Sequence, residues 1–353
     1  MKSRRRTHAL LFALLAALLI TSVAGAAPKD GAVVSLSVNQ GDFAATQDVL
    51  VTVTVSNPTR HTVRVLKWFT PAEGVEESLF AVMRDGQAVA YTGPLYKRPA
   101  ATGQDYITLR SGESISATVS LGEYYDLSQS GVYEIFYAVA AYNLFDEKGN
   151  SFQARDVLIS EKISVSIEGR APRAKPTPPP TPTPGGTAFN ACTVDQQALL
   201  LQARTDASAY AANSEAYLNA GTQGLRYTTW FGAYLSSRYT TVKTNFTRIS
   251  DAMDTAGITF DCKCKQNYYA YVYSNDPYKI YLCKVFWQAP ATGTDSKAGT
   301  QIHEMSHFDV VAGTEDWVYG QTNARNLASS DPNKAIENAD NHEYFAENTP
   351  SLP

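Results

Sequence analysis

The sequence predicts two domains, an N-terminal antiparallel β-sandwich and a C-terminal α+β domain. Residues 33–168 alternate apolar and polar side chains with a period of two, which is typical of strands that bury one face. A proline-rich stretch at 171–186 ends this pattern, and beyond it the apolar spacing becomes helical. A chain of 353 residues, 44% of them hydrophobic, is long enough to hold two cores.

The first 26 residues, 1–26, predict a secretory signal peptide. Basic residues at 2–6 precede an apolar run from Ala9 to Ile20, and small residues follow at 24–26. The run is too short to cross a bilayer comfortably, and no later segment approaches eighteen uninterrupted apolar residues, which disfavours the alternative of a membrane anchor. We therefore expect a secreted, extracellular protein without a membrane partner.

The N-terminal domain, residues 27–170, is expected to contain about seven strands. Turn signals such as Asn57-Pro58 and Asp85-Gly86 separate the alternating segments, and many short strands with turns between them favour a sandwich. His61 is isolated here, so we assign no site to this domain. The expected strands are residues 34–38, 49–55, 62–66, 79–83, 114–119, 132–137 and 157–165.

Residues 171–186 are expected to be a linker. Proline fixes φ and removes a backbone donor, so a segment this rich in proline stays extended and does not fold. The linker separates the N-terminal domain from a second domain at 187–353.

The second domain is expected to combine helices with a few short strands. Residues 195–218 and 227–253 carry apolar side chains at helical spacing, and we interpret the aromatic residues of the second run as core rather than groove. Short strands are expected at Thr259-Phe260, 269–273 and 279–283.

All four cysteines, Cys192, Cys262, Cys264 and Cys283, lie in the second domain. An even number in a secreted chain favours two disulfides, for which the sequence alone permits three connectivities. Metal binding is the alternative, but Cys262-x-Cys264 lacks the usual C-x-x-C spacing and no histidine is near.

The pattern His303-Glu304-Met305-Ser306-His307 predicts a zinc site. Residues four apart lie on the same face of a helix, so both imidazoles can bind one tetrahedral metal ion. Glu304 is then free to act as a base that takes a proton from the attacking water. The five-residue pattern alone is only moderately specific, because many chance matches are ordinary helix surface.

The expected helix around this pattern extends well beyond it. Asp295-Ser296 can cap a helix that runs through Val310, and Gly313 is a natural stop, which places both histidines mid-helix. The metzincin continuation is absent, because Val310 and Gly313 stand where that pattern needs glycine and a third histidine. The chain reverses at Gly313, which makes Asp316 the nearest candidate for the third ligand.

Other acidic residues follow the motif. Glu337 and Glu343 are the alternatives for a third ligand, as in thermolysin-type sites. Asp331 can cap a further helix with Pro332 at its first position. A stripe of four carboxylates then recurs at helical spacing, and such a stripe is most often a solvated face. Its members are Glu337, Asp340, Glu343 and Glu347.

The H-E-x-x-H pattern followed by Gly313-Thr314-x-Asp316-x-x-Tyr319-Gly320 resembles the signature of the aspzincins, the deuterolysin family of zinc proteases. Within it the sequence is similar to the peptidyl-Lys metalloendopeptidases over about residues 187–350. Further matching motifs occur in the same order, at Arg226–Gly232, Phe286-Trp287 and Thr292–Ser296.

The resemblance implies a zincin-like metalloprotease fold and a set of roles. One zinc ion would be held by His303, His307 and Asp316. Glu304 would be the catalytic base, and Tyr319 would donate a hydrogen bond to the oxyanion of the transition state.

The resemblance also assigns the substrate pocket and the disulfides. Asp340 and Glu343, in the matching segment Asn338–Phe345, would bind the lysine that follows the cleaved bond. Two carboxylates attract an ammonium group and reject an apolar side chain. The implied disulfides join Cys192 with Cys262 and Cys264 with Cys283.

The N-terminal domain resembles, more loosely, the propeptide domain of the same family, at the Val-Thr-Val-Ser-Asn-Pro run near Val55, at Val65–Trp68 and at Leu109–Ser114. It is therefore expected to inhibit the enzyme before processing. The alternative is a binding module that stays attached. Lys175 in the linker follows Ala174, so an enzyme that cuts before lysine could process itself there.

The expected function is a secreted zinc endopeptidase that cleaves before lysine. Thirty basic and 34 acidic residues give a net charge of −4, so nucleic acid is not an expected partner, and we expect a monomer that acts on proteins and peptides. Two alternatives are open: a deuterolysin-type endopeptidase without strict lysine preference, and a secreted binding protein with an inactive protease-like domain.

Overall fold

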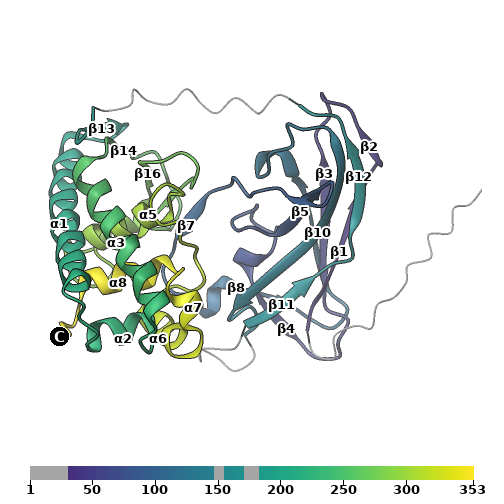
Figure 1. Cartoon of the computed structure of the whole chain (residues 1–353). Helices are drawn as coiled ribbons and strands as arrows, with labels where there is room; N and C mark the ends of the chain where they lie inside the picture. Colours follow the sequence, from purple (N-terminus) through teal and green to yellow (C-terminus); the bar gives the residue numbers. More distant parts are fainter. Residues whose placement is uncertain (1–30, 147–154, 171–182) are drawn as a thin grey trace, which may run out of the picture.

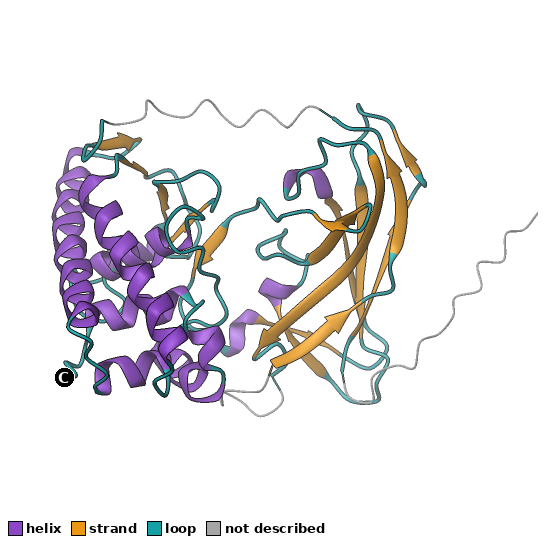
Figure 2. Cartoon of the chain, in the orientation of Figure 1, coloured by secondary structure: helices purple, strands orange, loops and turns teal. Residues whose placement is uncertain are grey.

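The computed structural model describes residues 31–146, 155–170 and 183–353. The expected signal peptide lies outside the described residues, as do residues 171–182 of the linker with Lys175. No helix in the described part of the chain is long and apolar enough to cross a membrane. Sheets build the N-terminal half, and helices with one sheet build the C-terminal half (Figures 1 and 2).

The described part of the N-terminal half forms three sheets. One has the order β1-β3-β9, the largest has the order β2-β12-β10-β5-β6 with β11 also on β10, and the third pairs β4 with β8. The strands are β1 Val33–Val38, β2 Asp42–Phe43, β3 Leu50–Ser56, β4 Val63–Leu66, β5 Phe80–Arg84, β6 Gln87–Ala88, β8 Tyr106–Leu109, β9 Ser114–Ser120, β10 Gly131–Tyr142, β11 Arg155–Ile159 and β12 Ile163–Ile167.

One buried cluster joins these sheets. Alternate residues of β3 (Val51, Val53 and Val55) and of β10 (such as Tyr133 and Ile135) face it, as period-two strands require. The expected single strand at 157–165 is wrong, because β11 ends at Ile159 and the chain turns before β12. The two strands pair with different parts of β10, and β12 also pairs with β2 in parallel.

The C-terminal half places a long helix, α1, beside the helix that carries the zinc motif, α5. Thr193 caps α1 in a capping box with Gln196, which explains where the helix begins. The expected helix at 227–253 is two helices, because Gly232 has φ 75° and interrupts the run. The helices are α1 Val194–Asn219, α2 Leu225–Phe231, α3 Ser236–Thr255, α4 Lys284–Gln288, α5 Lys297–His307, α6 Gln321–Ser330, α7 Pro332–Ala335 and α8 Ala339–Glu347.

The C-terminal sheet has the order β13-β14-β16-β15-β7. Its strands are β13 Thr187–Asn190, β14 Ile258–Asp261, β15 Ala270–Val272 and β16 Lys279–Leu282, which match the three expected strands and add β13. Its loops are held by the disulfides Cys192–Cys262 and Cys264–Cys283, the pairing that the resemblance implies.

The fifth strand of this sheet, β7 (Leu95–Lys97), comes from the N-terminal half. It pairs antiparallel with β15, and Figure 1 shows it against the C-terminal half, away from the other N-terminal strands. No strand was expected there. An N-terminal segment therefore completes the edge of the C-terminal sheet.

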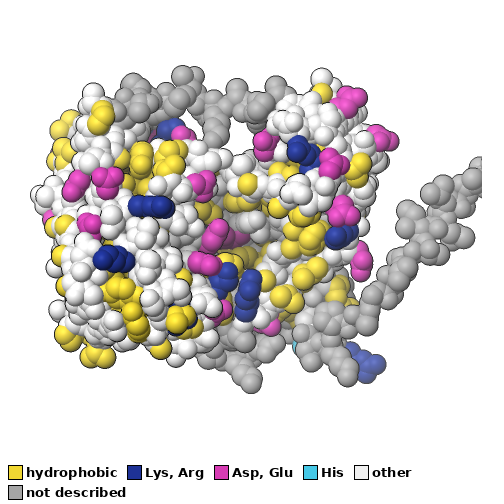
Figure 3. Space-filling view, in the orientation of Figure 1, with side chains coloured by type: hydrophobic (Ala, Val, Ile, Leu, Met, Phe, Trp, Pro, Cys, Tyr) yellow, Lys and Arg dark blue, Asp and Glu magenta, His cyan; other side chains and the backbone are white. Residues whose placement is uncertain are grey.

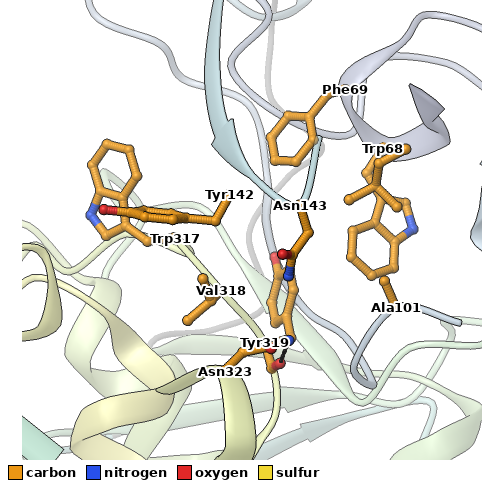
Figure 4. A pocket seen from close by; sticks show the side chains of 10 residues that line it. Trp68, Phe69, Ala101, Tyr142, Asn143, Trp317, Val318, Tyr319 and Asn323 are labelled. Carbon is orange, nitrogen blue, oxygen red and sulfur yellow. Dashed lines mark hydrogen bonds between the residues drawn. The ribbon is translucent and has the colours of Figure 1, made fainter. Parts of the chain in front are cut away.

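Apolar contacts continue around this strand. Trp68 from the N-terminal half meets Tyr319 edge-on, with ring centroids 5.4 Å apart, and Tyr142 packs with Val318 and Leu327. Figure 4 shows Trp68 and Tyr142 with Tyr319 around a small pocket between the halves. On the face in Figure 3, acidic and basic side chains are interspersed.

Candidate active site

The helix α5 presents the zinc motif and begins at a polar cap. The Ser296 hydroxyl accepts a hydrogen bond from Gly299 N, and the Glu347 carboxylate accepts from both Ser296 N and Oγ at 2.8 Å. Asp295 therefore does not cap the helix. The expected end near Gly313 is also wrong, because α5 stops at His307 and Val310 is exposed in the following loop.

The three predicted zinc ligands lie together in a fully enclosed position. Nε2 of His303 is 3.2 Å from one Asp316 carboxylate oxygen, and Nε2 of His307 is 3.2 Å from the other. Their ligand atoms lie within 4.8 Å of one another. The backbone reversal at Gly313, with φ 58°, carries the chain from α5 back to Asp316.

Both imidazoles are held with Nε2 directed to the site. Nδ1 of His307 donates a hydrogen bond to the Thr314 carbonyl at 2.7 Å, since a carbonyl can only accept. Nδ1 of His303 lies 3.0 Å from an Asp340 carboxylate oxygen and 3.3 Å from one of Glu343. The Thr314 carbonyl fixes the His307 tautomer that leaves Nε2 as an electron-pair donor, and the carboxylates near Nδ1 of His303 favour the same tautomer there.

These residues fit a zinc ion. Within the described part of the chain, Nε2 of both histidines and both carboxylate oxygens of Asp316 are buried and make no hydrogen bond. Leaving several polar atoms unsatisfied in one buried place is costly, and a cation bound between them would satisfy all of them. Two imidazoles and one carboxylate are a ligand set that zinc takes in catalytic sites.

Burial and charge act against each other on Asp316, the predicted third ligand. Burial favours the neutral carboxyl, but the adjacent His303 and His307 outweigh it and hold the pKa of Asp316 well below its usual range. A carboxylate that stays ionised is the form that binds a metal ion.

Glu304, the glutamate of the H-E-x-x-H pattern, is fully buried beside the three predicted ligands. Neither of its carboxylate oxygens has a hydrogen-bond partner among the described residues. Burial raises the pKa of Glu304 to about 7, against the lowering effect of the two histidines. A carboxylate with a pKa near neutrality can both take and return a proton.

The acidic pocket already holds a lysine, Lys97 of β7. Its Nζ is 2.5 Å from Glu343 Oε2 and 3.6 Å from both Asp340 Oδ1 and Asp295 Oδ1. The side chain is fully buried, with Nζ 4.7 Å from the ring centre of Tyr269. An ammonium group from the N-terminal half thus occupies the place that the resemblance gives to a substrate lysine.

The charges in this pocket compensate one another. Burial opposes the charged form of Lys97, but Glu343, Asp340 and Asp295 outweigh it and raise the pKa of Lys97 well above its ordinary value. For Asp340, burial is outweighed by Lys97 and His303, which lower its pKa, whereas burial raises the pKa of Glu343.

Tyr319 meets the same inserted segment. Its buried hydroxyl donates a hydrogen bond to the Tyr96 carbonyl at 2.8 Å and accepts one from Arg98 at 2.8 Å. Tyr96 directly precedes Lys97. The carbonyl that Tyr319 touches therefore belongs to the peptide bond on the amino side of the pocketed lysine.

The loop that carries Asp316 and Tyr319 is tied to the start of α8. Asn338 Oδ1 accepts from Trp317 N at 2.7 Å and Val318 N at 3.1 Å, and an Asp340 carboxylate oxygen accepts from Gly320 N at 2.6 Å. These bonds fix the position of Asp316 relative to Asp340 and Glu343.

The four carboxylates that were expected to form a stripe do not lie on one face of a single helix. The cap at Asp331 with Pro332 is as expected, but α7 ends at Ala335, and Glu337 lies before α8 and pairs with Lys334. Glu337 is therefore absent from the site. The remaining three, Asp340, Glu343 and Glu347, lie on α8, and all are buried rather than solvated.

Several residues at the site were not predicted from the sequence. Lys97 and Tyr96 enter from a strand of the other half, while Thr314 and Asn338 act through hydrogen bonds of short loops. The Tyr96-Lys97 dipeptide is itself a signal, because it is what an enzyme that cuts before lysine would bind. Other lysines in the chain carry the same signal, so it could not select this one.

Comparisons with known proteins show which proteins this chain is similar to. A family profile described as Lysine-specific metallo-endopeptidase matches residues 216–347. The chain is 46% identical to a protein named Extracellular protease from Aeromonas hydrophila, over 87% of this chain and 90% of that protein. It is 38% identical to Peptidyl-Lys metalloendopeptidase from Grifola frondosa, over 71% of this chain and 72% of that one. A solved zinc peptidase from Grifola frondosa covers 46% of this chain and 100% of its own, with 48% identity and a TM-score of 0.45.

Proposed function

Because this chain belongs to the aspzincin family of zinc metalloendopeptidases, we propose that it hydrolyses peptide bonds on the amino side of lysine in proteins and peptides. One observation carries this specificity. The Lys97 ammonium lies between Asp340 and Glu343 while Tyr319 donates to the carbonyl of the residue before it. A substrate lysine in the same pocket would place its own preceding carbonyl at Tyr319.

His303, His307 and Asp316 are the proposed zinc ligands. Zinc, when bound, acidifies water and polarises a carbonyl oxygen. Glu304 takes a proton from the attacking water and returns it to the departing lysine nitrogen, for which a pKa of about 7 suits it. Tyr319 stabilises the negative charge that develops on the carbonyl oxygen.

The acidic pocket provides selection by charge. A lysine ammonium that enters loses its water but gains the carboxylates of Asp340 and Glu343, as Lys97 does. An apolar side chain would leave these carboxylates buried and unpaired, which costs more than the apolar contact returns. Charge therefore favours lysine over apolar residues.

We further propose that the chain is made as an inhibited, secreted precursor. Residues 1–26 would be the signal peptide, 27–170 a β-sandwich pro-domain, 171–186 the linker and 187–353 the peptidase. The shared buried cluster of the N-terminal sheets supports the sandwich, and the strand β7, which pairs with β15 and places Lys97 against Asp340 and Glu343, supports inhibition. The name Extracellular protease of the Aeromonas relative supports secretion.

A digest of mixed unfolded proteins tests the specificity. The secreted, processed enzyme should release peptides that begin with lysine, and a zinc chelator should abolish their release. Peptides that begin with assorted residues would favour a deuterolysin-type enzyme without strict lysine preference. No chelator-sensitive cleavage would favour a binding protein. The Glu304→Gln chain provides the control for contaminating proteases.

A further inference from the structure

The strand β7 marks subsites beyond the lysine pocket, on the premise of the proposed cleavage before lysine. It pairs antiparallel with β15, with Lys97 opposite Ala270 and Tyr96 opposite Tyr271. Tyr269 N also donates to the Lys97 carbonyl at 2.9 Å. Extended peptides bind sheet edges in this way, so each side chain of β7 occupies the place of one substrate side chain.

Tyr96 stands where the residue before the cleaved bond would stand. Its ring lies 5.2 Å from the ring of Tyr268 and 5.2 Å from that of Tyr271, tilted by 59° and 48°. Both distances fall in the range in which aromatic rings attract one another. Tyr268 and Tyr271 belong to the peptidase half, so they stay with the enzyme if the N-terminal half is removed.

The peptidase half itself holds the Tyr271 ring and the backbone of Tyr268, while the Tyr268 hydroxyl donates a hydrogen bond to the Glu76 carboxylate of the N-terminal half at 2.6 Å. Tyr271 stacks on Tyr281 with centroids 4.5 Å apart and planes 4° from parallel. The backbone at Tyr268 is fixed because its carbonyl accepts from Val285 N at 3.0 Å, two residues after the disulfide-bonded Cys283. A preorganised surface loses less entropy when a ligand ring binds to it.

We propose that Tyr268 and Tyr271 form an aromatic subsite that makes the enzyme prefer an aromatic residue immediately before the lysine. The substrate class is thus aromatic-lysine peptide bonds, with tyrosine, phenylalanine and tryptophan ahead of small residues. A small side chain at this position would touch neither ring. The preference is expected to be roughly tenfold in kcat/KM for Tyr-Lys over Ala-Lys.

The proposal is tested with peptides that differ only in the residue immediately before the lysine. The full chain is expressed and processed, and kcat/KM is measured for Tyr-Lys, Phe-Lys, Leu-Lys and Ala-Lys peptides. A Tyr-Lys to Ala-Lys ratio near one in the unmodified enzyme would overturn the subsite. This measurement does not depend on the folding of any variant.

Variants then locate the preference. Tyr271→Ala should lower the Tyr-Lys to Ala-Lys ratio roughly threefold, because Tyr268 supplies the other ring, and Tyr271→Phe should keep the ratio, because the ring and not the hydroxyl makes the contact. Tyr234→Ala, an exposed tyrosine far from β15 in sequence, is the control. An unchanged ratio in a Tyr268→Ala, Tyr271→Ala double variant would also overturn the assignment.

A further pair of peptides separates this proposal from the lysine pocket. The ratio of Tyr-Lys to Tyr-Ala cleavage measures the lysine requirement alone. An enzyme that ignores lysine but prefers an aromatic residue would contradict the proposed function and keep the subsite. The reverse result would contradict the subsite and keep the proposed function.

Discussion

His303 connects the two parts of the site through its two ring nitrogens. Nε2 faces Asp316 at 3.2 Å, on the zinc side, while Nδ1 faces Asp340 at 3.0 Å, on the lysine side. The first contact is foreseeable from the spacing of the H-E-x-x-H pattern and the turn at Gly313. The second is not, because it depends on how α8 packs against α5.

The proposed ligands should differ from Glu304 in zinc retention. We expect alanine at His303, His307 or Asp316 to abolish stoichiometric zinc, whereas Glu304→Gln should keep zinc and lose roughly 10²- to 10⁴-fold in kcat, since it handles the proton. Metal content measured beside activity checks this. Glu337→Gln, at a half-exposed position paired with Lys334, is the control.

The opposite pattern would identify a different third ligand. Zinc retained in Asp316→Ala but lost in a Glu343 variant would contradict the aspartate assignment and favour a thermolysin-like ligand set.

Substitutions of Asp340 and of Glu343 should differ in their effect on zinc affinity. Both Asp340→Asn and Glu343→Gln should raise KM for lysine peptides, because the ammonium loses part of its counter-charge. Only Asp340→Asn should also weaken zinc binding by roughly 10- to 100-fold, because Asp340 is the nearer carboxylate to Nδ1 of His303. Competition with a zinc-binding dye measures this. Equal zinc affinity in the two variants would contradict the second role of Asp340.

Among the elements, α5 and α8 define the site because they pack closely at a glycine. A Cβ built on Gly299 would lie 2.0 Å from Glu347 Oε1 and 2.9 Å from Glu343 Oε1. The same Glu347 carboxylate binds the N-terminus of α5. The lysine pocket and the start of the zinc helix therefore share one tight contact.

Gly299→Ala should consequently destabilise the fold although alanine favours helices. We expect a loss of roughly 1–3 kcal/mol in the free energy of unfolding, because the buried Glu347 carboxylate must move away from its hydrogen bonds to Ser296. Thermal unfolding in a Glu304→Gln background, which prevents self-digestion, measures it. Gly41→Ala, where a Cβ meets nothing within 4 Å, should change the melting temperature little. Equal melting temperatures would contradict this packing.

Helix α8 also buries a neutral histidine. Nδ1 of His342 donates to the Asn338 carbonyl at 3.0 Å, and Nε2 accepts from Asn245 at 3.1 Å, so the neutral ring is fully satisfied. Burial is the main cause that lowers the pKa of His342 from 6.5 to about 4.

Acid should therefore weaken the fold through His342. Its contribution is present above pH 6.5 and is lost as the pH falls from 6.5 to about 4, because the unfolded chain takes up the proton first; a shift of this size corresponds to about 3 kcal/mol. Denaturant unfolding across this range should show a shallower pH dependence in His342→Gln. The same slope in both, with exposed His61→Gln as control, would contradict the assignment.

Helices and strands were predicted correctly where the apolar side chains keep one period over many residues. The 26-residue α1 and the N-terminal strands β1, β3, β4, β5, β9 and β10 were predicted, because a sustained pattern reflects a buried face, whereas the short strands β2, β6 and β8 were not. Breaks were not, as at Gly232, where a single positive φ divides one apolar run into two helices. The three-residue β7 was also missed, because it exists only through its partner β15, 170 or so residues away in the chain.

At the scale of the whole molecule, β7 connects two halves that the sequence predicts to be separate domains. Its Lys97 fills the acidic pocket, and Arg98 binds Glu77 of its own half and Tyr319 of the other. The inserted segment is thus held from both sides. No pattern within either half could reveal this, because the complementarity lies between them.

Removing the inserted charge should release the enzyme. Uncut Lys97→Met chain should cleave short lysine peptides at least roughly tenfold faster than uncut wild type, because a buried ammonium that anchors the strand is lost. Activity is measured together with a gel that shows the chain is intact. Lys162→Met, which removes an exposed ion pair with Glu134, is the control. Full activity of uncut wild type would contradict the proposed inhibition.

A covalent connection also determines how the proposed inhibition depends on concentration. While residues 171–182 link the halves, β7 encounters its partner strand β15 at an effective concentration on the order of millimolar. This effective concentration does not depend on how much protein is present. Once the link is cut, the same contacts must form between two separate molecules, so their occupancy falls with dilution. A chain cut in a crowded compartment would stay largely blocked there. It would become active only where the fragments disperse. Activation would then need two events, cleavage of the linker and dilution of the two fragments outside the cell.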